Sequence, residues 1–163
     1  MKSEAVKSEI ATSSTKHAPE GAEASMCFGC GSDNPWGLKL DFRDEGVKYV
    51  AEFTPRAEYQ GYPGILHGGI VCTLLDESMA RMLWSRGMKL PTGKLEVRFR
   101  RPARLDGHFR VEAFVSSQEG RIISCSSVLK DLTRDEVVAE GRATFLVPPQ
   151  MALKAKDDNQ SAG

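Results

Sequence analysis

A chain of 163 residues suits a single domain, and its 40% hydrophobic and 27% charged residues form an ordinary globular composition that can fill a core. The 22 basic side chains match the 22 acidic ones, so the overall charge favours neither nucleic acid nor an anionic membrane as a partner. The longest apolar stretches are too short for a transmembrane helix, and the first residues lack the apolar centre of a signal peptide. We therefore expect a cytoplasmic protein.

Both ends of the chain differ in composition from its centre. Residues 1–25 and 150–163 are polar and have no periodic apolar pattern, which indicates a disordered N-terminal tail and a flexible C-terminal tail. The folded domain is therefore expected at 26–149.

Two cysteines near the start of this domain, Cys27 and Cys30, have the spacing of half a zinc site. A complete site needs further ligands, but the other two cysteines lie alone in apolar segments and the three histidines are scattered. We therefore expect a tight turn with Gly29 and Gly31 at positive φ, the thiols packing as small hydrophobic groups. No metal and no cofactor is expected.

The domain is predicted to contain about six mainly antiparallel strands. Alternating apolar residues from 38 to 42, a turn at 44–46 and an apolar run over 47–53 predict a first hairpin. Further strands are predicted at 94–101, 109–117, 121–132 and 137–147. In the first of these, one face carries the charged residues Lys94, Glu96, Arg98 and Arg100, which indicates that this face contacts water.

A single helix is predicted from His67 to Arg86, because this segment has no proline and keeps apolar residues at helical spacing. Its polar residues form only a narrow band: Glu77, Ser78, Arg81 and Ser85. A helix that is apolar nearly all round belongs in a core. The predicted fold class is therefore α+β, with an antiparallel sheet wrapped around one long helix.

The start of this helix carries the first candidate chemistry. His67, Gly68 and Gly69 leave the first amide N–H groups uncovered, and the helix dipole adds partial positive charge there. A developing oxyanion would be stabilised at this position. Alternatively, the two glycines only permit close packing.

Asp76 is the candidate catalytic carboxylate. Its neighbours on the helical wheel are small or apolar: Gly69, Cys72, Thr73, Met79, Ala80 and Leu83. A carboxylate that loses solvation on such a face becomes a stronger base. The alternative is a structural ion pair between Asp76 and Arg81 or an arginine of a strand.

The spacing of these two features limits how they can act. Nine residues separate His67 from Asp76, which is about 13 Å along a helix axis and about half a turn in rotation. Gly68 and Asp76 of one helix therefore cannot act on the same bond. Either the acid works alone, or it meets the helix start of a second subunit in a symmetric dimer.

The segment from Tyr59 to Ile70, which contains His67-Gly68-Gly69, is followed by Leu74-Leu75-Asp76-Glu77 and resembles the HGG…D signature of hotdog-fold acyl-CoA thioesterases of the PaaI-like branch. The similarity extends to three further segments: Cys27 to Leu38, Arg100-Arg101-Pro102 and Glu140 to Val147. It therefore covers nearly all of 27–148.

The resemblance implies a hotdog fold and a homo-oligomer, either a dimer whose sheets join edge to edge or a tetramer. It implies that the amide of Gly68 holds the thioester oxygen, that His67 orients the substrate, and that Asp76 is supplied by the partner subunit. Thr92 stands where a hydroxyl often orients the water or the acid. The expected substrate contacts are Gly69, Gln60, Thr73, Glu77, Thr92, Arg100 and Arg101.

One position departs from the family pattern. Many relatives carry Asn six residues before the histidine, where this chain has Gly61. Gln60 is the neighbouring residue that could supply the amide instead.

The expected activity is hydrolysis of an acyl-CoA thioester. Asp76 would act either as a general base on water or as the nucleophile. Two alternatives remain: an acyl-thioester hydratase or dehydratase on the same fold, and a protein that binds acyl-CoA without turning it over.

Overall fold

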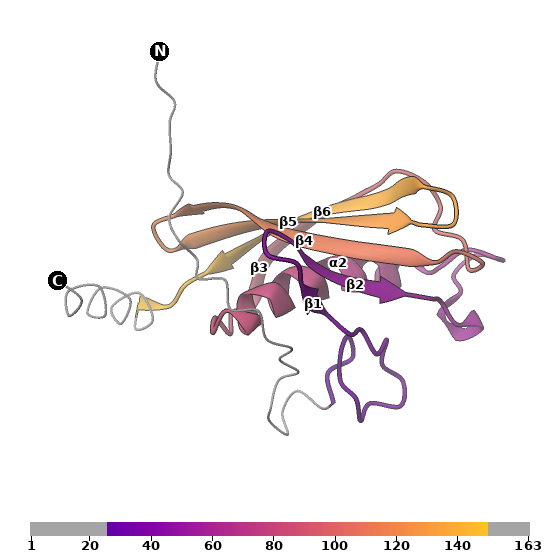
Figure 1. The fold of residues 1–163 in the computed structure, drawn as a ribbon, viewed down its shortest axis with the longest axis horizontal. Helices are drawn as coiled ribbons and strands as arrows, with labels where there is room; N and C mark the ends of the chain where they lie inside the picture. Colours follow the sequence, from indigo (N-terminus) through magenta and orange to yellow (C-terminus); the bar gives the residue numbers. More distant parts are fainter. Residues whose placement is uncertain (1–25, 150–163) are drawn as a thin grey trace, which may run out of the picture.

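The computed structural model describes residues 26–149, so the tails expected at 1–25 and 150–163 lie outside the described residues. One α-helix, α2 (Gly68–Ser85), lies against one face of a six-stranded antiparallel sheet (Figure 1). The strands are β1 (Arg43–Asp44), β2 (Tyr49–Phe53), β3 (Thr92–Phe99), β4 (Phe109–Glu119), β5 (Ile122–Asp131) and β6 (Glu136–Leu146), and a short 3-10 helix, η1 (Ala57–Tyr59), precedes α2. The predicted α+β fold class is confirmed.

The strands are ordered β1-β2-β4-β5-β6-β3 across the sheet, so the strand that follows the helix in sequence forms one edge. Leu95 of this edge strand is opposite Ala143 of β6, and Val97 is opposite Gly141. The other edge is β1, which has only two residues. The eight-residue strand β3 is therefore the long edge of the sheet.

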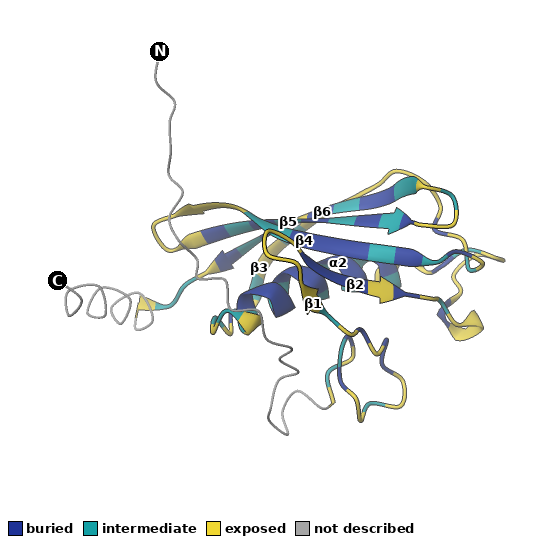
Figure 2. Cartoon of the chain, in the orientation of Figure 1, coloured by how far each residue is buried: buried dark blue, intermediate teal, exposed yellow. Residues whose placement is uncertain are grey.

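The core lies between the sheet and α2, and Figure 2 shows the buried residues gathered along this interface. Leu74 and Leu75 pack into one apolar cluster, while Met79, Met82 and Leu83 pack into a second. All five side chains are completely buried. This agrees with the prediction that the helix belongs to the core.

The polar band of the helix is less exposed than its composition indicates. Ser78 and Arg81 are buried, with 0% and 6% of their surface exposed. The hydroxyl of Ser78 donates to the Leu75 carbonyl within the helix, which satisfies it. The guanidinium of Arg81 lies over the Trp84 ring, 5.1 Å from its centroid.

The first hairpin is confirmed, but its first strand is much shorter than predicted. Residues 38–42 do not pair with β2, because the amides of Leu38 and Leu40 donate to the carbonyls of Phe28 and Gly29 instead. Lys39 between them has a φ of 59°, which interrupts an extended strand. The chain therefore packs against the Cys27–Cys30 turn before it enters the sheet.

This turn exists, but its glycines serve another purpose than predicted. The amide of Gly31 donates to the Cys27 carbonyl, which closes the turn. Gly29 and Gly31 are not among the glycines at positive φ, so that part of the prediction is wrong. Gly29 is needed for close approach, because a Cβ there would lie 2.5 Å from the Cδ of Glu77.

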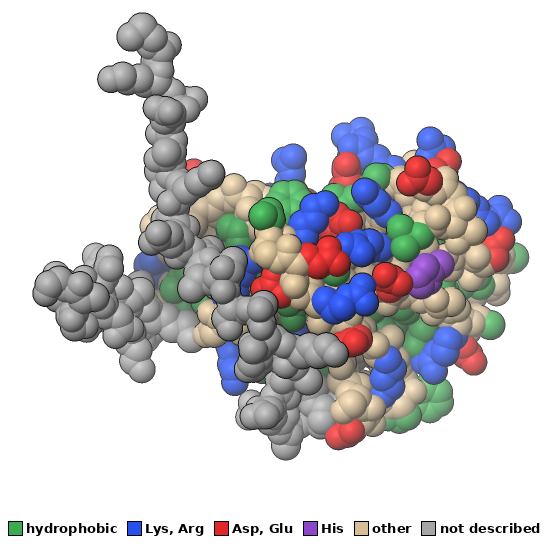
Figure 3. All heavy atoms as spheres, in the orientation of Figure 1, with side chains coloured by type: hydrophobic (Ala, Val, Ile, Leu, Met, Phe, Trp, Pro, Cys, Tyr) green, Lys and Arg blue, Asp and Glu red, His purple; other side chains and the backbone are tan. Residues whose placement is uncertain are grey.

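Charged residues cover the surface around β1, β2 and β4. Glu112 is paired with Lys48 and Arg110, and Arg110 also reaches Glu45. Figure 3 shows basic and acidic side chains interspersed over the visible face. None of the helices within 26–149 is long and apolar enough to cross a membrane.

Candidate active site

The first turn of α2 is organised by the His67 side chain, which caps the helix. Its Nδ1 accepts a hydrogen bond of 2.9 Å from the amide of Gly69. An acceptor at Nδ1 places the proton of a neutral imidazole on Nε2, so the exposed ring can donate to a ligand. The amide of Gly69, expected to contact substrate, is therefore already bonded within the protein.

The amide of Gly68 differs from that of Gly69. Within the described part of the chain, the Gly68 amide has no hydrogen-bond acceptor. The amides of Ile70 and Val71, by contrast, both donate to the His67 carbonyl. Gly68 is the first residue of the helix, where the dipole favours negative charge. The structure thus presents one free N–H at the position where the sequence predicts an oxyanion site.

Gly61, in the loop before the helix, lies close to His67. A Cβ on Gly61 would lie 3.1 Å from the Cα of His67, so any side chain there would contact the histidine. Gln60 does not replace this side chain, because its Oε1 accepts from the amide of Gly64 in its own loop. Among the described residues, neither position therefore supplies a side-chain amide that is hydrogen-bonded to His67.

Asp76 is held by Thr92, which lies at the start of β3. The Thr92 hydroxyl donates to Asp76 Oδ1 over 2.7 Å. Asp76 is half-buried rather than fully buried. Among residues 26–149 no ion pair involves Asp76, so the alternative of a structural pair with Arg81 or a strand arginine is not what the structure contains.

A β-bulge at Gly93 makes this contact possible. The pairing of β3 with β6 shifts between Thr92 and Lys94, so Gly93 has no partner of its own. In a regular strand Thr92 would share the exposed face of Lys94, because side chains alternate with a period of two. The bulge reverses this alternation and turns Thr92 towards the helix. Sequence reasoning missed Gly93, although a glycine at the start of a strand is a known signal for a bulge.

Small groups surround Asp76 on the helix. The hydroxyl of Thr73, one turn earlier, donates to the Gly69 carbonyl over 2.9 Å. Burial and the nearby charge of Asp76 raise the pKa of the half-buried Cys72 thiol. The thiol of Cys72 is therefore uncharged at neutral pH, and it adds no second negative charge beside the carboxylate.

A groove runs from the start of α2 to the end of β3. It has a volume of about 380 Å³ and is lined by Gly68, Phe99, Arg100 and Arg101 together with apolar residues of the preceding loop. β3 ends at Phe99, two residues earlier than predicted, so Arg100 and Arg101 lie outside the strand and need not point to opposite faces of the sheet. Both arginines line the groove beside Gly68.

The two arginines already have acidic partners. Arg100 donates twice to Glu140 Oε2, at 2.6 and 2.9 Å, and Arg101 lies 3.6 Å from Glu136. All four side chains are more than one third exposed, so these pairs are open to solvent and weak. An anionic ligand could therefore compete for the guanidinium groups.

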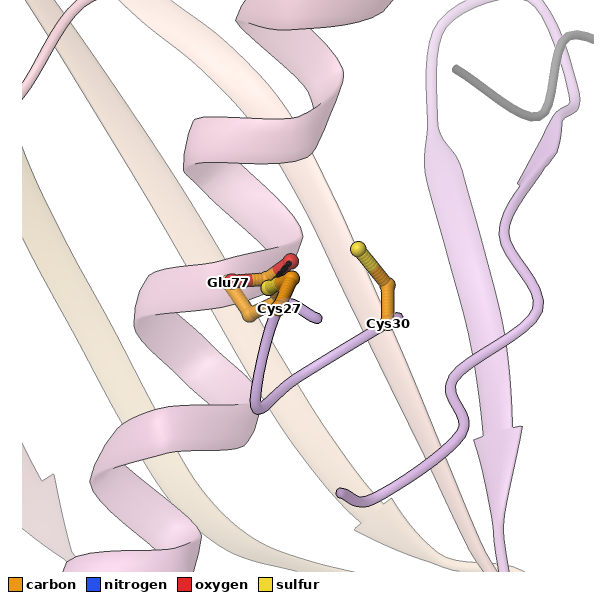
Figure 4. Close-up of side chains that lie close together, drawn as sticks. All are labelled: Cys27, Cys30 and Glu77. Atoms are coloured by element: carbon orange, nitrogen blue, oxygen red, sulfur yellow. Dashed lines mark hydrogen bonds between the residues drawn. The ribbon is translucent and has the colours of Figure 1, made fainter. Parts of the chain in front are cut away.

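Glu77 is directed away from the pair of Asp76 and Thr92. Its Oε1 accepts from the thiol of Cys27 over 3.3 Å. Figure 4 shows the Cys27 side chain against Glu77, with Cys30 on the same turn. The structure thus separates Glu77, expected as a substrate contact, from the other residues of the candidate site.

The comparisons with known proteins agree with this fold and this segment. The family model of the thioesterase superfamily matches residues 63–138, which run from the loop before α2 into β6. The chain is 28% identical to acyl-coenzyme A thioesterase 13 of Mus musculus over 100 residues, covering 60% of this chain and 71% of the relative. It is 26% identical to acyl-coenzyme A thioesterase THEM4 of Mus musculus over 97 residues, covering 60% of this chain and 42% of the relative. The matched segment is thus less than half the length of THEM4.

Among solved structures, the chain is similar to the E. coli PaaI protein from the phenylacetic acid degradation operon, with a TM-score of 0.62 and 22% identity. This match covers 68% of the present chain and 80% of PaaI. The expected hotdog fold is therefore confirmed. The chain is thus similar to the thioesterase superfamily over residues 63–138, and its fold is the hotdog fold.

Proposed function

We propose that the protein hydrolyses acyl-CoA thioesters at sites shared between two copies of the chain. The observation that carries this proposal is the free amide of Gly68 at the start of α2, in a groove with two arginines. An N–H at a helix start stabilises a developing oxyanion, and arginines bind phosphates. The relatives named acyl-coenzyme A thioesterases support CoA as the thiol carrier.

Asp76 supplies the reacting carboxylate in this proposal. It either removes a proton from the attacking water or attacks the thioester carbonyl itself. The hydroxyl of Thr92 fixes the carboxylate through Oδ1, which leaves Oδ2 for the substrate or the water. His67 orients the thioester through Nε2–H, since its Nδ1 is bonded to Gly69.

The second copy is required by the helix. Gly68 and Asp76 lie eight residues apart on α2, about 12 Å along its axis, so one thioester cannot contact both in the same chain. We propose that the long edge strand β3 pairs with β3 of a second copy. Such a pairing covers the half-exposed Leu95 and Val97 and the exposed Phe99, and an unprotected edge of this length otherwise promotes aggregation.

A panel of acyl-CoA esters, followed by release of free thiol, tests the activity. We expect turnover of at least one ester, and we expect Asp76→Asn to lower this turnover by a factor of about 10² or more. If no ester is turned over while acyl-CoA still binds, the protein is an acyl-CoA-binding protein. Gly61 is the observation that favours this second candidate, because it leaves His67 without the amide that many relatives have.

A further inference from the structure

The turn formed by Cys27 and Cys30 meets α2 at a cluster of metal-binding atoms. The two Sγ atoms and a carboxylate oxygen of Glu77 all lie within 4.8 Å of one another (Figure 4). The sequence supplies two zinc ligands at the usual spacing, and the fold adds a third from a residue 47 positions after Cys30. Thiolate and carboxylate are both zinc ligands.

The turn is packed closely onto Glu77. Gly29 lies so close that a Cβ would be 2.5 Å from the Cδ and Cγ of Glu77. A side chain at this position would have to displace either the Glu77 side chain or the turn. The close approach thus holds the two thiols beside the carboxylate.

Arg81 gives an independent observation at the same place. It lies one helical turn after Glu77, has only 6% of its surface exposed, and lines a hollow of about 310 Å³ together with Cys27, Cys30 and Glu77. Its Nε and Nη1 are buried and have no hydrogen-bond partner within the described residues. A buried guanidinium without hydrogen-bond acceptors is costly, so a negatively charged group in the same hollow would stabilise it.

We propose that Cys27, Cys30 and Glu77 bind one zinc ion, with Arg81 as the charged group that stabilises the complex. Binding of Zn²⁺ forms two zinc–sulfur bonds and one zinc–oxygen bond, and releases the two thiol protons to solvent. Two thiolates and one carboxylate with Zn²⁺ carry a net charge of about −1, which the guanidinium of Arg81 neutralises.

Three protein ligands leave one position of a tetrahedral zinc ion open. The hollow beside the cluster is lined by Trp84, Lys89 and Leu90, and it gives an external ligand or water access to that position. The site is separate from Asp76 and Thr92, and it does not depend on the proposed hydrolase activity.

The experiment measures metal content and spectra rather than turnover. The full chain is reduced, desalted and titrated with Zn²⁺ or with Co²⁺, whose bond to thiolate gives a charge-transfer band in the near ultraviolet. We expect one zinc ion per chain by elemental analysis, and a cobalt band that is lost in Cys27→Ser and Cys30→Ser. Glu77→Gln is expected to weaken zinc binding at least about tenfold, and Arg81→Met by about 10- to 100-fold, as for other groups that support metal ligands.

Cys125→Ala is the matched control, because Cys125 is buried in the sheet outside the cluster and should leave zinc binding unchanged. A rise of the melting temperature with Zn²⁺ in the parent chain, absent in Cys27→Ser, is expected as a second readout. The proposal is overturned if the reduced chain binds no zinc, or if zinc binding survives loss of both cysteines. It is also overturned if inorganic phosphate binds through Arg81 while zinc does not, because the hollow is then an anion site.

Discussion

The hydroxyl of Thr92 reaches Asp76 Oδ1 over 2.7 Å because Gly93 forms a bulge that turns the start of β3 towards the helix. This contact fixes one oxygen of the Asp76 carboxylate. Within 26–149, the other carboxylate of the helix, Glu77, is bonded to a thiol and not to a hydroxyl. A hydrogen bond to a charged group contributes about 1.5–3 kcal/mol, which corresponds to about 10- to 100-fold in rate if it positions the reacting group.

Thr92→Val keeps the shape of the side chain and removes the hydroxyl. We therefore expect kcat for an acyl-CoA ester to fall by about tenfold or more, with little change in stability. Thr92→Ser keeps the hydroxyl and is expected to retain most of the activity. Equal kcat in the Val and Ser variants would mean that Thr92 does not position Asp76.

Gly68 offers a substitution that removes one N–H and little else. It is the first residue of α2, where proline is tolerated, and His67 before it has φ −59° and ψ 134°, which suits a residue before proline. A Cβ at this position would contact only the Phe99 ring, at 3.6 Å. We expect Gly68→Pro to lower kcat by about 10²- to 10³-fold, as for loss of an oxyanion donor.

Gly68→Ala is the control for this substitution, because it adds the same Cβ and keeps the amide hydrogen. It should keep most of the activity. If alanine and proline reduce kcat equally, the cause is crowding near Phe99 and not the lost N–H.

Arg100 and Arg101 are expected to hold the phosphates of CoA, since both line the groove beside Gly68. Alanine at either position should raise KM for CoA esters several-fold and spare a short thioester that lacks the nucleotide. Arg98→Ala is the control, because Arg98 is exposed in β3, two residues before Arg100, and does not line the groove. An equal response of both substrates, or of neither, would place the nucleotide elsewhere.

The sequence was sufficient for the fold class, for the helix and for most strand positions, because long apolar patterns and turn residues specify them locally. Residues 38–42 were predicted wrongly for a physical reason. Their alternation is that of a strand, but the backbone bonds to the turn at 27–30, which lies far from β2 in the sequence. A local pattern carries no information about which distant segment will supply the hydrogen-bond partners.

The candidate site was predictable to a similar extent. The motif at 67–69 and the spacing to Asp76 could be interpreted from the sequence, and they led to the expectation of two subunits. The bulge at Gly93, the burial of Arg81 and the contact of Glu77 with Cys27 could not be, because each depends on packing between distant segments. The sequence grouped Arg81 and Ser78 in a narrow polar band of the helix, and the structure buries both side chains.

Stability should depend on Glu112 in the acid range. Burial alone would raise the pKa of this carboxyl, but hydrogen bonds from Lys48 and Arg110 outweigh it and hold the pKa below its ordinary value of 4.5. A lowered folded-state pKa stabilises the protein fully above the unfolded value, and this contribution is lost as pH falls through the folded value. Glu112→Gln should therefore cost about 1–2 kcal/mol in the free energy of unfolding at pH 7.

The cost of Glu112→Gln should shrink as pH falls from about 4.5 through the lowered pKa, because the parent carboxyl becomes neutral as well. Urea unfolding of both proteins across this pH range measures the difference. A difference that stays constant with pH would mean that the loss comes from packing and not from the charge of Glu112.

The most direct test of a shared thioesterase site is a mixture of two inactive variants. The Asp76→Asn protein and the Gly68→Pro protein should each turn over acyl-CoA more slowly than the parent chain, by a factor of about 10² or more. A mixed dimer contains one site with an intact Gly68 from one chain and an intact Asp76 from the other. After subunit exchange of equal amounts, verified by native mass spectrometry, about one quarter of the parent activity should return. Activity that stays at the average of the two variants, despite verified mixed dimers, would contradict a site built from both copies.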